Sequence, residues 1–174
     1  VLYNILVPFA DDYAVLNLFR YLTFRTGGAV ITALIVSFVF GPAVIRWLRA
    51  SQAEGQPIRD DGPQSHLETK QGTPTMGGFL ILLALVVGTL LWADLSNRFV
   101  WVVLMVTFGF GAVGFVDDYL KVTRRNHRGL PGRGKLGVQF AIALVATMWI
   151  STLMPAQFAT TLAVPFFKDV LLQL

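Results

Sequence analysis

Two adjacent carboxylates, Asp117 and Asp118 in the stretch GFVDDYLK, are the residues of this sequence best suited to chemistry. They follow a long uncharged segment, so two like charges meet at the border of an apolar environment, where ionised groups are costly. If a helix ends nearby, they also lie at its negative pole. Stability alone does not favour such a pair, and ionisable groups at a membrane boundary indicate a function.

A purely local role for the pair is the alternative. Lys121 lies four residues after Asp117 and three after Asp118, so it can pair with both on one face of a helix. Each such pair contributes only about 0.2–0.5 kcal/mol. Local pairing therefore does not explain why a second acid is present.

Phosphate chemistry with Mg²⁺ fits these carboxylates best. Mg²⁺ is usually bound by one or two carboxylates together with phosphate oxygens. Lys70, Lys121 or the neighbouring arginines can neutralise the remaining phosphate charge. His66 and His127 each lack a nearby second histidine or a cysteine, so we expect solvated loop residues rather than metal ligands.

Two glycine-rich stretches resemble nucleotide-binding motifs only formally. GFGAVG, at residues 109–114, matches a dinucleotide fingerprint, but it lies in an apolar span without a preceding strand. We interpret its glycines as helix-packing positions. GTPTMGG, at residues 72–78, lacks the Lys and Ser/Thr that complete a phosphate loop. Its backbone N–H groups at a helix start could bind an anion, and a simple helix start broken by Pro74 is equally favoured.

Four apolar blocks must position these residues. The chain has 174 residues, of which 55% are hydrophobic and 14% charged, too few charges to cover a soluble domain of this size. The blocks predict an all-α polytopic membrane protein with transmembrane helices at about 26–48, 76–93, 99–119 and 136–154. Pro42 should kink the first helix or mark its exit. A five-residue turn at 94–98 should join the second and third.

The positions of Lys and Arg predict the orientation. Basic loops stay in the cytoplasm, so the loops at about 49–75 and 120–135 should be cytoplasmic and both ends of the chain periplasmic. Because orientation already explains this charge, we expect no nucleic-acid partner. The ten basic residues on the cytoplasmic side are Arg46, Arg49, Arg59, Lys70, Lys121, Arg124, Arg125, Arg128, Arg133 and Lys135.

Three motifs in register resemble the phospho-N-acetylmuramoyl-pentapeptide transferase family. They are DDGPQSH at 60–66, KQGTPTMGG at 70–78 and GFVDDYLKV at 114–122, and YLTFR at 21–25 and VPFFKD at 164–169 also look like this family. Related enzymes that transfer N-acetylhexosamine phosphates to polyprenyl phosphates share the paired aspartates and are the alternative. The amino-acid sequences of the second and third motifs favour the muramoyl-pentapeptide branch.

The resemblance implies a Mg²⁺-dependent enzyme of the bacterial inner membrane, acting in peptidoglycan synthesis. Its substrates would be UDP-N-acetylmuramoyl-pentapeptide and undecaprenyl phosphate, and its products lipid I and UMP. Asp117 would be the base or orienting group for the lipid phosphate, and Asp118 a second acid beside the metal. Lys70, Thr75 and Lys121 would line the cytoplasmic site. A homodimer or another membrane partner remains open.

The sequence departs from the family in length. Such enzymes look like bundles of ten spans, with another essential aspartate and a histidine-rich loop in the second half. We therefore expect residues 1–174 to form a single membrane-embedded domain, the N-terminal part of a longer protein, and to be inactive alone. Two other classes remain as alternatives: part of a transporter or channel, which predicts acids deeper in the membrane, and a non-catalytic subunit that uses the glycine face as a partner surface.

Overall fold

The fold is helical, as the apolar blocks predict. A computed structural model describes residues 1–52, 76–124, 129–155, 161–163 and 171–173. Within these residues every element is a helix except one short pair of strands. The elements are α1 (Leu2–Leu6), the 3-10 helices η1 (Val7–Phe9) and η2 (Ala14–Arg20), α2 (Leu22–Ser51), α4 (Gly78–Trp92), α5 (Arg98–Thr123), α6 (Gly132–Leu153), β1 (Thr161–Ala163) and β2 (Leu171–Gln173).

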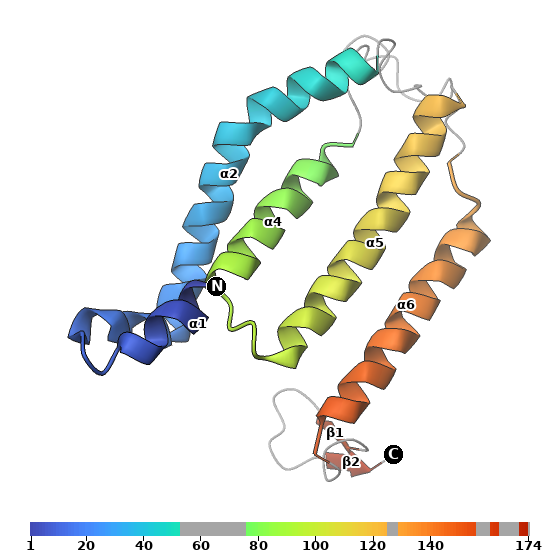
Figure 1. The fold of residues 1–174 in the computed structure, drawn as a ribbon. Coiled ribbons are helices and arrows are strands. Elements are labelled where there is room, and N and C mark those ends of the chain that lie inside the picture. Colours follow the sequence, from blue (N-terminus) through green and yellow to red (C-terminus); the bar gives the residue numbers. More distant parts are fainter. Residues whose placement is uncertain (53–75, 125–128, 156–160, 164–170, 174) are drawn as a thin grey trace.

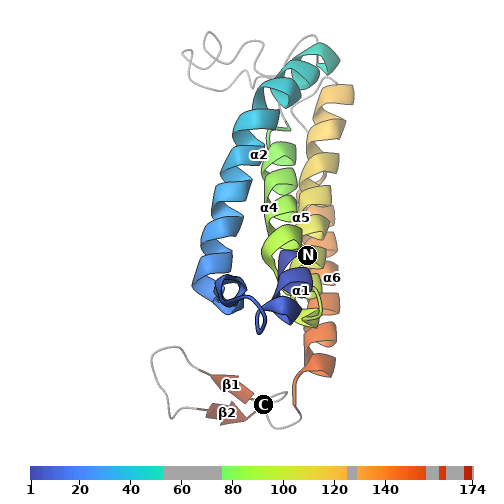
Figure 2. The same ribbon diagram turned by 60° about the vertical axis from the view of Figure 1, so that its left-hand side comes forward.

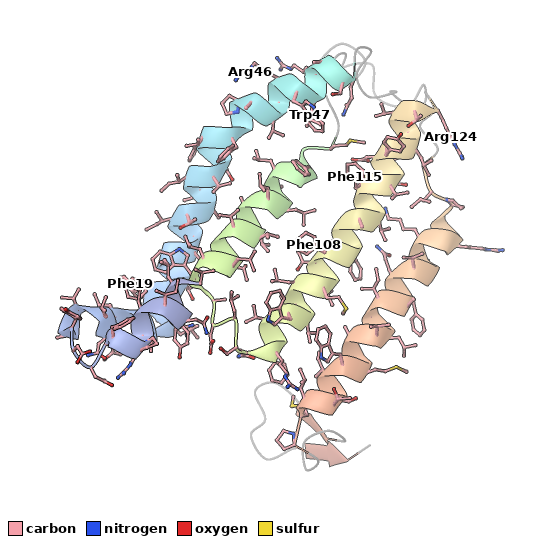
Figure 3. All side chains as sticks on the ribbon, viewed as in Figure 1. Phe19, Arg46, Trp47, Phe108, Phe115 and Arg124 are labelled. Atoms are coloured by element: carbon pink, nitrogen blue, oxygen red, sulfur yellow. The ribbon has the colours of Figure 1, made fainter. Side chains whose placement is uncertain are left out.

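The four long helices stand in one row, in the order of the chain (Figures 1 and 2). α2 packs on α4, α4 on α5, and α5 on α6, while α1 and the two 3-10 helices gather at one end of α2. The buried apolar side chains are small or of medium size, such as Ala84, Val102 and Ala146, because they lie where neighbouring helices touch. Many large apolar residues are exposed instead, among them Phe38 and Phe140, and Phe108, which is labelled in Figure 3, has a residue exposure of 53%.

Among the described residues, three helices are long and apolar enough to cross a membrane, namely α2, α5 and α6. The predicted second span is present as α4, but it has only 15 residues. At about 1.5 Å per residue such a helix is roughly 22 Å long, shorter than the roughly 30 Å of a hydrocarbon core. The described residues thus form a multi-pass membrane unit with one short helix.

Pro42 lies inside α2, and the helix bends in that region but continues to Ser51 (Figure 1). Of the two predicted outcomes, the kink is therefore confirmed and the exit is not. Proline removes one intrahelical hydrogen bond and crowds the preceding turn, which accounts for the bend. Beyond it, the ring of Trp47 lies 6.3 Å from that of Phe79 at the start of α4.

A tight hairpin joins α4 and α5, as predicted, with residues 93–97 between the helices. The Asn97 side chain caps α5 by accepting a hydrogen bond from the Phe99 N–H. Asn4 reaches the same turn from α1, where its amide donates to Asp94 Oδ1 and Ser96 Oγ. Hydrogen bonds from α1 and from the N-cap of α5 therefore stabilise the turn.

The two strands β1 and β2 were not predicted. They pair antiparallel, with Thr161 opposite Gln173 and Ala163 opposite Leu171. Three residues are too few to show the alternation of polar and apolar side chains by which a strand is recognised in a sequence. The pair lies beyond the end of α6, at the end of the row away from the C-terminal end of α5, which carries Asp117.

Candidate active site

Asp117 and Asp118 lie in the last two turns of α5, which continues past them to Thr123. Asp117 is buried, with a residue exposure of 9%. One of its oxygens, Oδ2, lies 2.7 Å from Lys121 Nζ and 3.8 Å from Lys135 Nζ. The other, Oδ1, accepts a hydrogen bond of 2.8 Å from the Leu130 N–H. Two ammonium groups and one backbone N–H, from two helices and their connection, therefore hold this carboxylate.

Asp118 has a different environment. Its side chain is 30% exposed, against 13% for that of Asp117, and its Oδ1 lies 3.4 Å from Lys121 Nζ. Lys121 thus contacts both carboxylates, as the spacing in the sequence predicts. Asp118 is the more accessible of the two to a ligand.

The connection between α5 and α6 closes over Asp117. At Gly129 an added Cβ would collide with the Asp117 carboxylate and would also crowd the Lys121 side chain. Glycine is therefore required at this position by close approach. The neighbouring Leu130 N–H is brought within hydrogen-bond distance by the same approach.

A pocket of about 370 Å³ opens beside the two carboxylates. Met76, Gly78 and Phe79 at the start of α4 form one wall, and Gly114 of α5 and Lys135 of α6 also line it. The helix start places the positive end of the α4 dipole next to the pocket, which favours an anion there. Met76 has a positive φ of 71°, a conformation that is uncommon for a residue with a side chain.

Both signs of charge line one recess. The carboxylates suit a cation, and Lys135 with the start of α4 suits phosphate oxygens. Among the described residues no group of three or more His, Cys, Asp and Glu side chains could hold a metal ion. Two carboxylates still fit Mg²⁺, which takes its other ligands from phosphate and water. Asp118 is the more exposed candidate ligand, while Lys121 stands between the two acids.

Some predicted site residues are not placed by the structure. Lys70, Thr75, His66 and His127 lie outside the described residues. The structure brings together Asp117, Asp118 and Lys121 and adds Lys135, which the sequence analysis had counted only as a loop charge. A signal for it existed: Lys135 falls in the first turn of α6, where the helix dipole disfavours a cation unless an anion compensates.

Two glycines of the GFGAVG stretch lie at helix contacts, and the third lines the pocket. A Cβ at Gly109 would press on Ile142 of α6, and one at Gly111 on Leu82 of α4. The packing interpretation is confirmed for these two positions. Gly114 has open space around it and lines the pocket instead.

Comparison with known proteins connects this site to a family. Residues 70–82 match the model of phospho-N-acetylmuramoyl-pentapeptide-transferase signature 1, and they include the start of α4 beside the pocket. Over its whole length the chain is 56% identical to a curated phospho-N-acetylmuramoyl-pentapeptide-transferase of Granulibacter bethesdensis and covers 48% of that protein. It is 54% identical to that of Maricaulis maris and covers 49%. The predicted resemblance is thus confirmed, and the chain spans about half the length of the curated relatives it matches.

Proposed function

The chain belongs to the phospho-N-acetylmuramoyl-pentapeptide transferase family, and from this premise we propose the reaction of the protein that it forms part of. That protein transfers phospho-N-acetylmuramoyl-pentapeptide from UDP to undecaprenyl phosphate, giving lipid I and UMP for peptidoglycan synthesis. An oxygen of the lipid phosphate attacks the sugar-linked phosphorus of the nucleotide. The bond from that phosphorus to the bridging oxygen breaks, and UMP leaves with the electron pair.

The recess lined by Asp117, Asp118 and Lys135, with Lys121 paired to both acids beside it, is the observation that carries the proposal. Phosphoryl transfer needs little covalent help from a protein, and catalysis rests on positioning and on neutralising charge. Lys121 and Lys135 supply positive charge next to the pocket, and the start of α4 adds its dipole. Mg²⁺, when bound, would neutralise the diphosphate and the developing charge of the leaving UMP.

The two aspartates take different roles in this proposal. Asp118 is the more exposed acid and would be a ligand of the metal. Asp117 orients Lys121 and Lys135 toward the phosphates, or accepts a proton from the lipid phosphate. Lys70 and Thr75, which lie in the motif that leads into α4, complete the binding of the substrate phosphates. Further metal ligands come from the part of the longer protein that this chain does not include.

The site faces the cytoplasm of a bacterial inner membrane in this proposal. Figure 3 places Arg46 and Arg124 at the same end of the helix row, and Asp117 lies in α5 toward that end. Basic residues concentrate on the cytoplasmic side of membrane proteins. The opposite end, with α1 and the strands, then faces the periplasm.

The decisive test uses the full-length protein with labelled UDP-N-acetylmuramoyl-pentapeptide, undecaprenyl phosphate and Mg²⁺. A labelled lipid product is expected, lost when a chelator removes the metal and restored when Mg²⁺ is returned. Asp11→Asn is the matched control for loss of a carboxylate, because Asp11 is exposed and pairs with Arg20 at the other end of the row. A lipid product that forms equally well in chelator contradicts the metal-dependent mechanism, and no lipid product contradicts the reaction.

A further inference from the structure

A second polar pocket lies at the opposite end of the row from Asp117. Its volume is about 330 Å³, and it is lined by the starts of α2 and α5 and the end of α4. Arg25, in the first turn of α2, is its cationic residue. The guanidinium carbon lies 4.4 Å from the centre of the Tyr3 ring, so α1 covers one face of the group.

The Arg25 guanidinium lacks an anionic partner in the part of the chain that the structure describes. Its Nε is buried and makes no hydrogen bond there. Asp94 lines the same pocket, but its Oδ1 accepts hydrogen bonds from the Asn4 amide and the Ser96 N–H. A buried donor without a partner is unfavourable, so this guanidinium favours an acceptor that the described residues do not supply.

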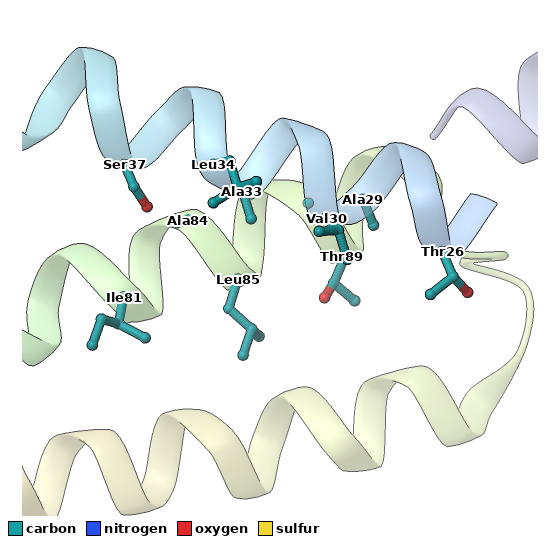
Figure 4. A pocket seen from close by; sticks show the side chains of 11 residues that line it. Thr26, Ala29, Val30, Ala33, Leu34, Ser37, Ile81, Ala84, Leu85 and Thr89 are labelled. Carbon is teal, nitrogen blue, oxygen red and sulfur yellow. The ribbon is translucent and has the colours of Figure 1, made fainter. Parts of the chain in front are cut away.

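An apolar groove of about 400 Å³ between α2 and α4 leads away from this pocket (Figure 4). The groove and the pocket share Thr26, Ala29, Gly88 and Thr89, so they adjoin each other. Along α2 the groove extends from Thr26 to Ser37. At about 1.5 Å per residue this is roughly 16 Å, close to half of a roughly 30 Å hydrocarbon core, which is the depth of one leaflet.

We propose that the Arg25 pocket and the α2–α4 groove together bind one phospholipid from the leaflet at that end of the row. The lipid phosphate accepts hydrogen bonds from the Arg25 guanidinium, whose planar donors match phosphate oxygens. One acyl chain lies along Ala29, Ala33 and Leu34 of α2 and Ala84 and Leu85 of α4. A phospholipid fits these features. Its anionic phosphate lies beside Arg25 at the outer end of the groove, and its acyl chain lies along the apolar lining.

The site is independent of the transfer reaction, since it lies at the other end of the helices from Asp117 and Asp118. The test measures phosphatidylglycerol bound to the purified full-length protein by native mass spectrometry in detergent. Arg25→Gln should weaken binding roughly tenfold, the loss expected when one charge-assisted hydrogen bond is removed. Arg20→Gln is the control, because Arg20 is an exposed arginine at the same end that pairs with Asp11.

A second pair of variants tests the acyl-chain groove. Ala33→Leu fills the groove and should also weaken phosphatidylglycerol binding, while Ala43→Leu adds the same bulk to an exposed position of α2 outside the groove and should not. Arg25→Lys keeps the positive charge but lacks the planar pair of donors, so its binding should fall between that of the unchanged protein and that of Arg25→Gln. Thermal unfolding in the same detergent verifies that each variant is folded. Asp118→Asn should bind phosphatidylglycerol like the unchanged protein.

The source of the phosphate is tested with two further probes. A diacyl glycolipid without phosphate should bind as weakly to the unchanged protein as phosphatidylglycerol binds to Arg25→Gln. Inorganic phosphate should not displace the phospholipid. Equal phosphatidylglycerol binding by Arg25→Gln and the unchanged protein overturns the proposal, as does full displacement by inorganic phosphate. If Ala33→Leu binds normally, another part of the longer protein fills the groove and the acyl-chain assignment is wrong.

Discussion

Asp117 and Asp118 are adjacent in the chain, yet replacing each should have a different effect on stability. Asp117→Asn leaves Lys121 and Lys135 without their shared carboxylate beside a buried position, so it should lower the free energy of unfolding by about 1–3 kcal/mol. Asp118→Asn changes a more exposed side chain and should lower it by less than about 0.5 kcal/mol. Thermal unfolding of the full-length protein in detergent measures both.

The same two variants should both lose transferase activity, by about 10²-fold or more, as expected for groups that position reactants or transfer a proton. Asp11→Asn, at the other end of the row, should keep both activity and stability. If Asp118→Asn is fully active, the pair serves structure through Lys121 and the proposed metal role is wrong.

Gly129 offers a test that leaves every charge in place. Gly129→Ala places a methyl group against the Asp117 carboxylate and should displace it from Lys121 and Leu130. We expect activity to fall at least tenfold, because small misplacements of positioning groups are costly in catalysis. Gly132→Ala is the matched control, since an added Cβ there meets nothing within 4 Å. Equal activities of the two variants would show that the carboxylate position is not critical.

The sequence could predict this site only in part. The two acids and Lys121 share one helix, so their spacing alone places them together. Lys135 and the Leu130 N–H arrive from another segment, and no pattern in the sequence specifies that the connection folds back over Asp117. The role of Gly129 depends on the same fold-back.

At the scale of the helices, the neighbouring glycines Gly27 and Gly28 of α2 allow the effect of packing on stability to be measured separately from the effect of helix propensity. Gly28→Ala would place a methyl group 2.5 Å from the Trp92 ring. That ring is fixed by stacking on Phe19 and by a hydrogen bond of 2.9 Å from its Nε1 to Thr32. Because the indole cannot move freely, Gly28→Ala should destabilise the protein by about 1–3 kcal/mol.

Gly27→Ala is the control for this change, because an added Cβ at Gly27 meets nothing within 4 Å. It should be neutral or stabilise the helix by about 0.5–1 kcal/mol, since alanine is the better helix former. Denaturation of both variants, followed by circular dichroism, gives the comparison. Similar unfolding midpoints would mean that the α2–α4 contact near Trp92 contributes little.

The sequence predicted the positions of the four long helices well and the residues at which they begin and end less well. The apolar blocks located all four helices, because a long uncharged segment is stable in a membrane only as a helix. The predicted range 26–48 became Leu22–Ser51, since α2 continues through Pro42 and into a basic end that an apolar count does not include. The predicted range 76–93 became Gly78–Trp92. Near the start of this helix, Trp47 in the bent end of α2 packs against Phe79.

At the scale of the molecule, the proposed orientation can be tested by labelling. The 174 residues contain no cysteine, so single cysteines can be introduced at chosen ends. Ser96→Cys lies in the exposed turn between α4 and α5 and should react with a membrane-impermeant maleimide from the periplasmic side of cells. Arg124→Cys, exposed at the end of α5, should react only after the membrane is opened. The reverse pattern would invert the proposed topology.

The dependence of activity on the rest of the protein is a separate prediction. Residues 1–174 expressed alone should insert in the membrane but produce no lipid product, because the proposed metal and nucleotide sites need further ligands. The full-length protein prepared in the same detergent is the positive control. Transferase activity of the 174-residue chain, with its mass of 19.2 kDa verified, would show that these residues hold a complete site.

The single row of helices also bears on how the protein is made. Each long helix packs on the one synthesised just before it, so these contacts join segments that are close in the sequence. The α4–α5 and α5–α6 contacts form early and quickly, because closing the short connections 93–97 and 124–131 costs little chain entropy. Each hairpin can therefore assemble while the ribosome is still adding later residues.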